Sequence, residues 1–199
     1  MKTSLRTLFK FASITLFSIT LIACSSTPVS IQLTPKIDEN LDSPTLTSQH
    51  KWSIDSQDLR VALYLIDIHS NDGVATLVNE SSSSRLLVQS TLQKYWIEKG
   101  IKINKDQQSD YNIDIQLVKL LSISKEESFS HKTTASIIIK VHLTSKTKSF
   151  IKTFRSRSLK EGSMSADIND INEDLSRQLS KLMTKIATDT ELNTAFRTF

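Results

Sequence analysis

The sequence predicts an α+β domain in which a mostly antiparallel sheet carries two amphipathic helices packed on one face. Three observations support this fold class. Strand-like runs follow one another through short turns, which favours antiparallel pairing. Two longer segments each have a single apolar stripe, and such a helix needs only one surface to pack against. The 199 residues are 38% hydrophobic and 23% charged, which is ordinary for a folded globular protein.

The predicted domain opens with three strands. Residues 51–56 and 60–68 are rich in aliphatic side chains and partly alternate with polar ones. The tripeptide Asn71-Asp72-Gly73 is a hairpin signal, and residues 74–78 form the returning strand. We therefore expect these three runs to pair through tight connections.

A helix is predicted over residues 85–99. The serine run at 81–84 supplies N-cap side chains, whose oxygens accept free backbone N–H groups. Gly100 stands where a helix end favours a left-handed residue. The apolar stripe of this helix consists of Val88, Leu92, Tyr95 and Trp96.

Four further strands are predicted, over 101–103, 111–117, 134–143 and 150–159. The second of them alternates with period two, and its phase shifts after Leu117. A shift of this kind predicts a β-bulge or a strand buried on both faces.

The last large element is a long amphipathic helix, followed by a short helix over 190–196. Asp167 and the Ser165 hydroxyl are candidate N-caps of the long helix. Its stripe follows spacings of three and four: Ile168, Ile171, Leu175, Leu179, Leu182 and Ile186.

Residues 1–23 have the pattern of a lipoprotein signal peptide. Three basic residues precede an apolar run over 11–23, which is too short for a comfortable transmembrane helix. The run ends in Leu21-Ile22-Ala23-Cys24, a lipobox. We expect cleavage between Ala23 and Cys24, S-diacylglycerol on the Cys24 thiol and an N-acyl (palmitate-type) chain on the new amino group. Two or more acyl chains give stable anchoring.

Residues 24–50 are expected to be a flexible tether ahead of a single domain over 51–199. All three prolines of the sequence fall here, and polar residues interrupt each apolar run. The alternative is that residues 29–33 add an edge strand to the domain. Ser25, in place of an Asp, favours sorting to the outer membrane with the domain facing the periplasm.

The lipobox and the order of elements resemble the YajG-like family of uncharacterised bacterial lipoproteins. The carrying features include Asp58-Leu59-Arg60, Ser84–Leu87, the helix end at 95–100 and the strand at 111–117. The resemblance covers nearly the whole chain. It implies an envelope lipoprotein without an assigned activity.

Composition argues against several functional classes. Without the three basic residues of the signal peptide, 22 basic residues (25 − 3) face 21 acidic ones, so a basic nucleic-acid-binding domain is not expected. The single cysteine is assigned to lipid, and no Gly-flanked serine elbow or Gly-rich phosphate loop is present. His131 and His142 have opposite parity on one predicted strand, so their side chains should point to opposite faces and we expect no metal site. Because these catalytic and phosphate-binding motifs are missing, we also expect no cofactor and no enzymatic activity.

Two small groups of charged residues are candidate recognition sites. Asp58 and Arg60 follow the first strand, where a local ion pair is the alternative interpretation. Arg155 and Arg157 share one face of a strand and suit phosphate or carboxylate groups, unless that face is simply solvated.

The sequence therefore predicts a membrane-anchored envelope lipoprotein that acts as a non-enzymatic binding or structural module. Its partners would be the membrane, through the covalent lipid, and an envelope protein or peptidoglycan. The alternative is a carrier of a small apolar or lipid ligand held between the helices and the sheet.

Overall fold

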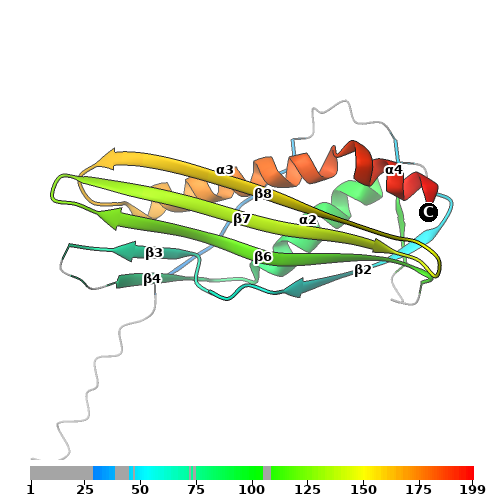
Figure 1. Ribbon diagram of the computed structural model, residues 1–199, viewed down its shortest axis with the longest axis horizontal. Helices are drawn as coiled ribbons and strands as arrows, with labels where there is room; N and C mark the ends of the chain where they lie inside the picture. Colours follow the sequence, from blue (N-terminus) through cyan, green and yellow to red (C-terminus); the bar gives the residue numbers. More distant parts are fainter. Residues whose placement is uncertain (1–28, 39–44, 47, 72, 74, 105–108) are drawn as a thin grey trace, which may run out of the picture.

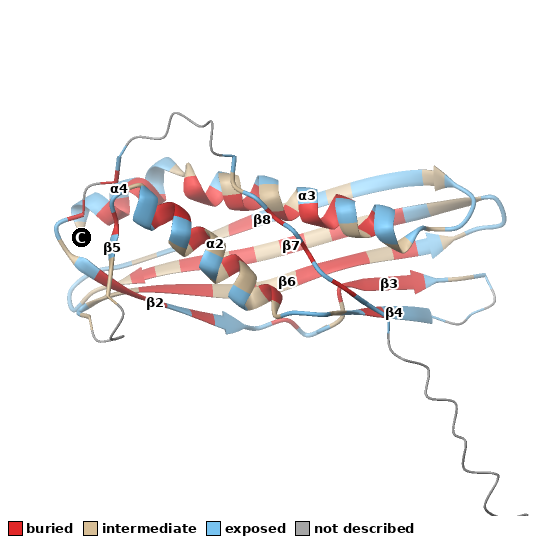
Figure 2. Cartoon of the chain, turned by 180° about the vertical axis from the view of Figure 1, so that it is seen from behind, coloured by how far each residue is buried: buried red, intermediate tan, exposed pale blue. Residues whose placement is uncertain are grey.

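The computed structural model describes residues 29–38, 45–46, 48–71, 73, 75–104 and 109–199. The expected signal peptide and the lipidation residues Ala23 and Cys24 lie outside these residues. The described chain forms one long sheet with helices along one side (Figures 1 and 2). None of the described helices is both long enough and apolar enough to span a bilayer.

The described sheet has eight strands with the path β1-β4-β3-β6-β2-β5, and β7 and β8 extend it from β6. The strands of this sheet are β1 Ser30–Ile31, β2 Lys51–Asp58, β3 Ile66–His69, β4 Ala75–Glu80, β5 Lys102–Ile103, β6 Tyr111–Glu126, β7 Ser130–Thr144 and β8 Ser149–Ser163. The three longest strands follow one another along the chain and form an antiparallel meander.

The expectation of a mostly antiparallel sheet is wrong, because the sheet is mixed. Of its seven pairings, four are parallel (β1 with β4, β2 with β5, β2 with β6 and β3 with β6) and three are antiparallel. The long connection through the first helix brings the chain back into the sheet at β5 and β6, so these strands run parallel to β2. The sheet is also curled, and three helices rather than two lie along it within the described residues (Figure 1).

The strand predicted over 60–68 is shorter than expected. β2 and β3 lie one after the other along the same edge of β6, and both run parallel to it. Asp58 pairs with Leu117 and Ile66 with Ser122, so the seven residues 59–65 lie opposite the four residues 118–121. The surplus forces the segment out of the sheet, at the place where the predicted bulge interrupts β6 between Leu117 and Lys119.

The helices of the described residues are α2 Ser84–Glu98, α3 Ile168–Ala187 and α4 Thr190–Thr198. The predicted caps are present, since the Ser83 side chain accepts from the backbone N–H of Leu86 and Asp167 accepts from Asn169 and Asp170. Gly100 ends α2 with φ +102°, and a Cβ there would lie 3.0 Å from the Leu46 carbonyl oxygen. Both the backbone conformation and this close approach require glycine.

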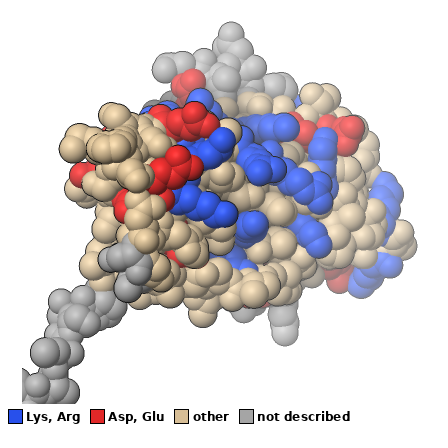
Figure 3. All heavy atoms as spheres, turned by 60° about the vertical axis from the view of Figure 1, so that its left-hand side comes forward, with Lys and Arg blue, Asp and Glu red and all other residues tan. Residues whose placement is uncertain are grey.

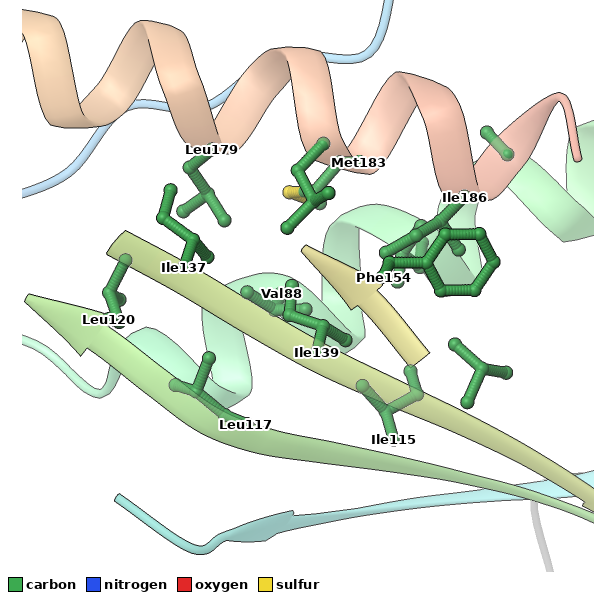
Figure 4. Close-up of a cluster of buried hydrophobic side chains, with 14 of the residues drawn as sticks. Val88, Ile115, Leu117, Leu120, Ile137, Ile139, Phe154, Leu179, Met183 and Ile186 are labelled. Carbon is green, nitrogen blue, oxygen red and sulfur yellow. The ribbon is translucent and has the colours of Figure 1, made fainter. Parts of the chain in front are cut away.

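One hydrophobic core fills the space between the helices and the inner face of the sheet. Leu179, Met183 and Ile186 of α3 point toward the strands (Figure 4). They meet aliphatic side chains of the central strands and Phe154 of β8, all of which are buried. The inner-facing residues of β7 are every second one: Thr133, Ala135, Ile137, Ile139, Val141 and Leu143.

The described part of the expected tether lies against the domain. β1 adds a parallel strand beside β4, as the alternative interpretation of residues 29–33 anticipates. Ile31 and Leu33 are buried, at 8% and 3% exposure, and Leu46 is 1% exposed beside the end of α2. For the described residues, the folded domain therefore begins ahead of residue 51.

Residues 34–38 continue this segment along α3 without forming a further strand. The backbone N–H groups of Thr34, Lys36 and Asp38 donate to the side-chain oxygens of Ser176, Ser180 and Thr184, over 3.2, 3.0 and 3.3 Å. Every second residue of the extended segment thus meets every fourth residue of the helix. The repeats match, because two strand residues advance about 6.6 Å and four helix residues about 6 Å. We call residues 29–38 the strap.

Candidate functional site

Six basic side chains gather on the outer face of the sheet, away from the helices. We call this surface the basic face; it comprises Lys119, Lys125, Lys132, Lys140, Arg155 and Arg157. The same alternation that turns the aliphatic residues of β7 inward turns its lysines outward. Figure 3 shows Lys and Arg gathered on this side, with most of the visible Asp and Glu toward the margins.

Strand register places these cations in adjacent rows. Lys119 of β6 and Arg155 of β8 both pair with Ile138, so they flank it across three strands. The next row holds Arg157, opposite Ser136, and the preceding row holds Lys140. Neighbouring strands lie about 4.8 Å apart, so one extended anionic ligand could contact several of these charges at once.

Most of this positive charge has no local acidic partner. Lys119, Lys140, Arg155 and Arg157 have no carboxylate within 4.0 Å among the residues that the structure describes. Lys132 is the exception, since its ammonium lies 2.8 Å from Glu161. The hydrogen bond and the charge of Glu161 raise the pKa of Lys132, but an ion pair this exposed contributes little stability.

A shallow hollow of about 490 Å³ lies within the basic face, over the outer side of strands β6 and β7. Its walls include Leu121 and Ile123 as well as Lys119 and Arg157. Ile151, 59% exposed on β8, adds apolar surface on the same side. Cations interleaved with aliphatic side chains suit the carboxylates and apolar atoms of another protein surface.

Asp58 and Arg60 come together in a second, separate cluster with Glu80. Arg60 donates from Nε and Nη2 to the two carboxylate oxygens of Asp58, over 2.9 and 2.7 Å, and from Nη2 to Glu80 over 3.1 Å. Its side chain is only 1% exposed. The same Glu80 oxygen accepts from the backbone N–H of Ser84 at the start of α2. We call these three residues the Arg60 cluster.

Charge and burial act together in the Arg60 cluster. The side-chain hydrogen bond from Arg60 lowers the pKa of Asp58. Burial on its own would lower the pKa of Arg60, but the hydrogen bond to Asp58 and the negative charges of Glu80 and Asp58 raise it overall. The remaining nitrogen, Nη1, has no hydrogen-bond partner among the described residues but is buried, so the cluster fits a structural role better than recognition of an external ligand.

The structure therefore separates the four residues singled out in the sequence into two groups. Asp58 and Arg60 share one cluster, and Arg155 and Arg157 lie on the basic face. Sequence reasoning missed Lys119 and Lys140, although both occupy outward positions of alternating strands. It also missed Glu80, because 20 residues separate it from Arg60.

No group of three or more His, Cys, Asp or Glu side chains that could hold a metal ion occurs among the described residues. His131 faces inward on β7, over Gly162 of β8, and His142 faces outward and contacts Ser149 over 2.9 Å. The two histidines therefore lie on opposite faces of the sheet.

A solved structure with a TM-score above 0.5 shares this fold at low sequence identity. A crystal structure of a Xanthomonas campestris protein of the DUF330 family is 14% identical, with a TM-score of 0.60, over 84% of this chain and 97% of that chain. A minor lipoprotein from Acinetobacter baumannii is 6% identical over 75% of this chain and 92% of that one, with a TM-score of only 0.38. No curated protein matches the chain.

The family comparison covers most of the sequence. A family model described as uncharacterized lipoprotein matches residues 35–197, which include all of the sheet except β1 and nearly all of the three helices. This match confirms the resemblance stated from the sequence. Membership also implies anchoring to a membrane of the cell envelope. The chain therefore belongs to the YajG-like family of uncharacterised lipoproteins.

Proposed function

We propose that this lipoprotein is a non-enzymatic binding module, held by lipid on Cys24 at the outer membrane, whose basic face docks an acidic envelope protein in the periplasm. The single observation that carries the proposal is the set of unpaired cations on a regular sheet. Lys119, Lys140, Arg155 and Arg157 are fixed by continuous strands, so their spacing is set before any partner binds. Preorganised charge of this kind favours both specificity and fast association.

An acidic protein fits the basic face better than peptidoglycan does. The half-buried Ile123 and the exposed Ile151 lie among the cations and add apolar contact area. Interfaces between proteins combine such apolar contacts with charged hydrogen bonds. Peptidoglycan offers carboxylates as well, but its glycan strands are polar and would leave the aliphatic side chains without matching contacts.

The alternative function, a carrier of an apolar ligand between the helices and the sheet, has less support. The side chains of α3 and of the central strands occupy that space and contact one another (Figure 4). A hollow of about 1060 Å³ does lie between α2 and α3 on the outer side of the helices. Its lining mixes Pro35, Ile37 and Tyr95 with the charged side chains Lys94, Glu98 and Lys181, so it is not the uniformly apolar cavity that a lipid chain needs.

Carbodiimide cross-linking in intact cells tests the proposed partner, because this reagent joins lysine amines to carboxylates. The lysines of the basic face should form adducts with one acidic protein, and peptide mapping should place the bonds at Lys119 or Lys140. Arg155→Glu/Arg157→Glu should abolish these adducts, since like charges would then repel the partner. Lys181→Glu/Lys185→Glu is the matched control, because it changes the same total charge on exposed positions of α3.

Two results would contradict the proposal. One is an adduct that sediments with cell-wall sacculi and is released by a muramidase, which would identify peptidoglycan as the partner. The other is an unchanged adduct in the Arg155→Glu/Arg157→Glu variant, which would place the docking surface elsewhere on the domain.

A further inference from the structure

The segment between β2 and β3 has an inverted pattern of polarity. Leu59, Val61 and Leu63 are 46%, 103% and 62% exposed, whereas Arg60 between them is buried. An extended segment on a water-exposed surface ordinarily turns its charges outward and its aliphatic side chains inward. Exposed aliphatic side chains grouped in this way indicate a contact with another surface.

The Arg60 cluster keeps the segment in this orientation. Asp58 precedes the segment in β2, and Glu80 belongs to the end of β4, so Arg60 is attached to two strands at once. With the guanidinium fixed inward, the side chains of Leu59 and Val61 on either side of it point outward, as their exposed fractions show. The seven residues 59–65 also protrude, since they lie opposite only four residues of β6.

This segment lies at the same edge of the molecule as the start of the strap. The Val29 carbonyl accepts from the backbone N–H of Asn79 over 3.0 Å, and Arg60 reaches the next residue of β4, Glu80. Figures 1 and 2 both show the β2–β3 connection and the start of the strap along this edge. Val29 is itself 47% exposed. We call Val29, Leu59, Val61 and Leu63 the apolar edge.

The length of chain between the apolar edge and Cys24 limits how far this edge can be from a membrane. Val29 is five residues after Cys24, and five residues span at most about 18 Å even when fully extended. The 15 residues of β8, for comparison, span about 50 Å. Acyl chains on Cys24 would therefore hold the apolar edge close to the bilayer surface, with the rest of the domain farther away.

We propose that the apolar edge inserts into the interfacial region of the membrane that holds the lipid anchor, and so fixes the orientation of the domain. This inference rests on lipid attachment at Cys24, which is part of the proposed function. The surface that the apolar edge contacts is the lipid bilayer. Membrane contact explains why three aliphatic side chains point outward next to a buried arginine, and it leaves the basic face free to meet a partner.

A fluorescent label at position 61 of the mature, lipidated protein tests this insertion. Cys24 is the only cysteine of the sequence, and its thiol is blocked in the lipidated form, so Val61→Cys supplies a unique site for a polarity-sensitive fluorophore. The protein is reconstituted in vesicles of zwitterionic phosphatidylcholine, with or without nitroxide groups on the acyl chains, so that no net lipid charge attracts the basic face. We expect the emission to shift to shorter wavelength, and nitroxide-bearing lipid to quench most of it.

Lys181→Cys, on the exposed side of α3, is the matched control and should show neither the shift nor strong quenching. Adding Leu59→Ser and Leu63→Ser to the Val61→Cys protein should markedly reduce the quenching, because less apolar surface remains to hold the segment in the lipid. Equal emission and quenching at positions 61 and 181 would overturn the proposal.

The vesicles contain no protein partner, so this experiment is independent of the basic face. Arg155→Glu/Arg157→Glu in the Val61→Cys background should leave the quenching unchanged. Quenching without cross-links from Lys119 or Lys140 would contradict the docking role alone. Cross-links without quenching would contradict insertion of the apolar edge alone.

Discussion

The two edges of β6 are occupied in opposite ways. On one edge, β7 pairs with it antiparallel over nearly its whole length, and β8 continues the meander. On the other edge, β2 and β3 pair with it parallel in two short stretches, separated by the protruding residues 59–65. The regular side presents the basic face, and the interrupted side presents the apolar edge. One sheet can thus hold two different contact surfaces, because regular pairing fixes the spacing of charges and interrupted pairing releases a loop.

The largest effect is expected where α3 covers the regular side. Leu179 is fully buried against the sheet, so Leu179→Ala removes apolar contacts and leaves a cavity (Figure 4). We expect a loss of about 2–5 kcal/mol in the free energy of unfolding, measured by denaturant titration. Lys181→Ala, on the exposed side of the same helix, should stay within about 0.5 kcal/mol of the wild type. A small loss for Leu179→Ala would mean that α3 is not a core element.

The strap gives the corresponding test on the interrupted side. Leu33 is 3% exposed, and Leu33→Ala should lower the free energy of unfolding by about 2–3 kcal/mol, at the low end for leucine because the strap lies near the surface. Gln32→Ala, one residue away with an exposed side chain, is the control and should have little effect. Equal stability of the two variants would show that residues 29–38 form a tether that contributes nothing to the fold.

The Arg60 cluster should contribute a smaller, pH-dependent stabilisation. Arg60→Ala leaves Asp58 and Glu80 without their shared partner. Because the Asp58 and Glu80 side chains remain 25% and 22% exposed, we expect the free energy of unfolding to fall by only about 1–3 kcal/mol at neutral pH.

The pH dependence follows from the lowered pKa of Asp58. A carboxylate with a lowered pKa stabilises the folded state above its ordinary pKa of 3.8, and this contribution disappears as the pH falls through the folded-state value. The difference in stability between the wild type and Arg60→Ala should therefore be constant near neutral pH and shrink below about pH 4. A difference that persists unchanged at pH 2 would show that lost packing, rather than the ion pair, causes the effect.

The smallest effect on stability is expected on the basic face. Arg155→Glu/Arg157→Glu replaces exposed side chains that have no ion-pair partner among the described residues, so the thermal midpoint should change by only a few degrees. Thermal unfolding followed by circular dichroism measures this change. A large drop would mean that both arginines support the sheet, and the cross-linking loss expected for this variant would then reflect unfolding.

The regular side of β6 could be predicted from the sequence and the interrupted side could not. Adjacent strands of a meander are local in sequence, and the alternation over 134–143 identifies both faces of β7 directly. β2 pairs with residues about 59 positions later, across a helix, and a local pattern carries no information about such a partner. The antiparallel expectation followed from extending the local rule to strands that the helix separates.

The first part of the strap is only the alternative interpretation of residues 29–33, although the signal for the whole strap is present in the sequence. Ile31, Leu33, Pro35 and Ile37 alternate with polar residues, and this is the period of a half-buried extended segment. The prolines outweighed that alternation in the interpretation of residues 24–50. The serines that accept hydrogen bonds from the strap could not be recognised from the sequence, because Ser176 and Ser180 lie between the apolar positions of an already complete stripe.

The basic face and the apolar edge differ in the same way in how far the sequence identifies their residues. Arg155 and Arg157 were singled out because their parity is visible within one strand, and the strand register then adds Lys119 and Lys140. Of the apolar edge, the sequence places only Val61 and Leu63 in the strand predicted over 60–68. Only the structure shows that Arg60 turns inward and that Val61 and Leu63 turn outward, since the partner Glu80 comes from another strand.

Site-specific photo-cross-linking in cells tests most directly whether one sheet holds two different contact surfaces. A photoreactive amino acid is placed at Thr153, on the outer face of β8, or at Val61, and each adduct is identified as protein or lipid by mass spectrometry. We predict a protein adduct from position 153 and a phospholipid adduct from position 61. Protein adducts from both positions, or a phospholipid adduct from position 153, would contradict the division of the sheet into a partner-binding side and a membrane-facing side.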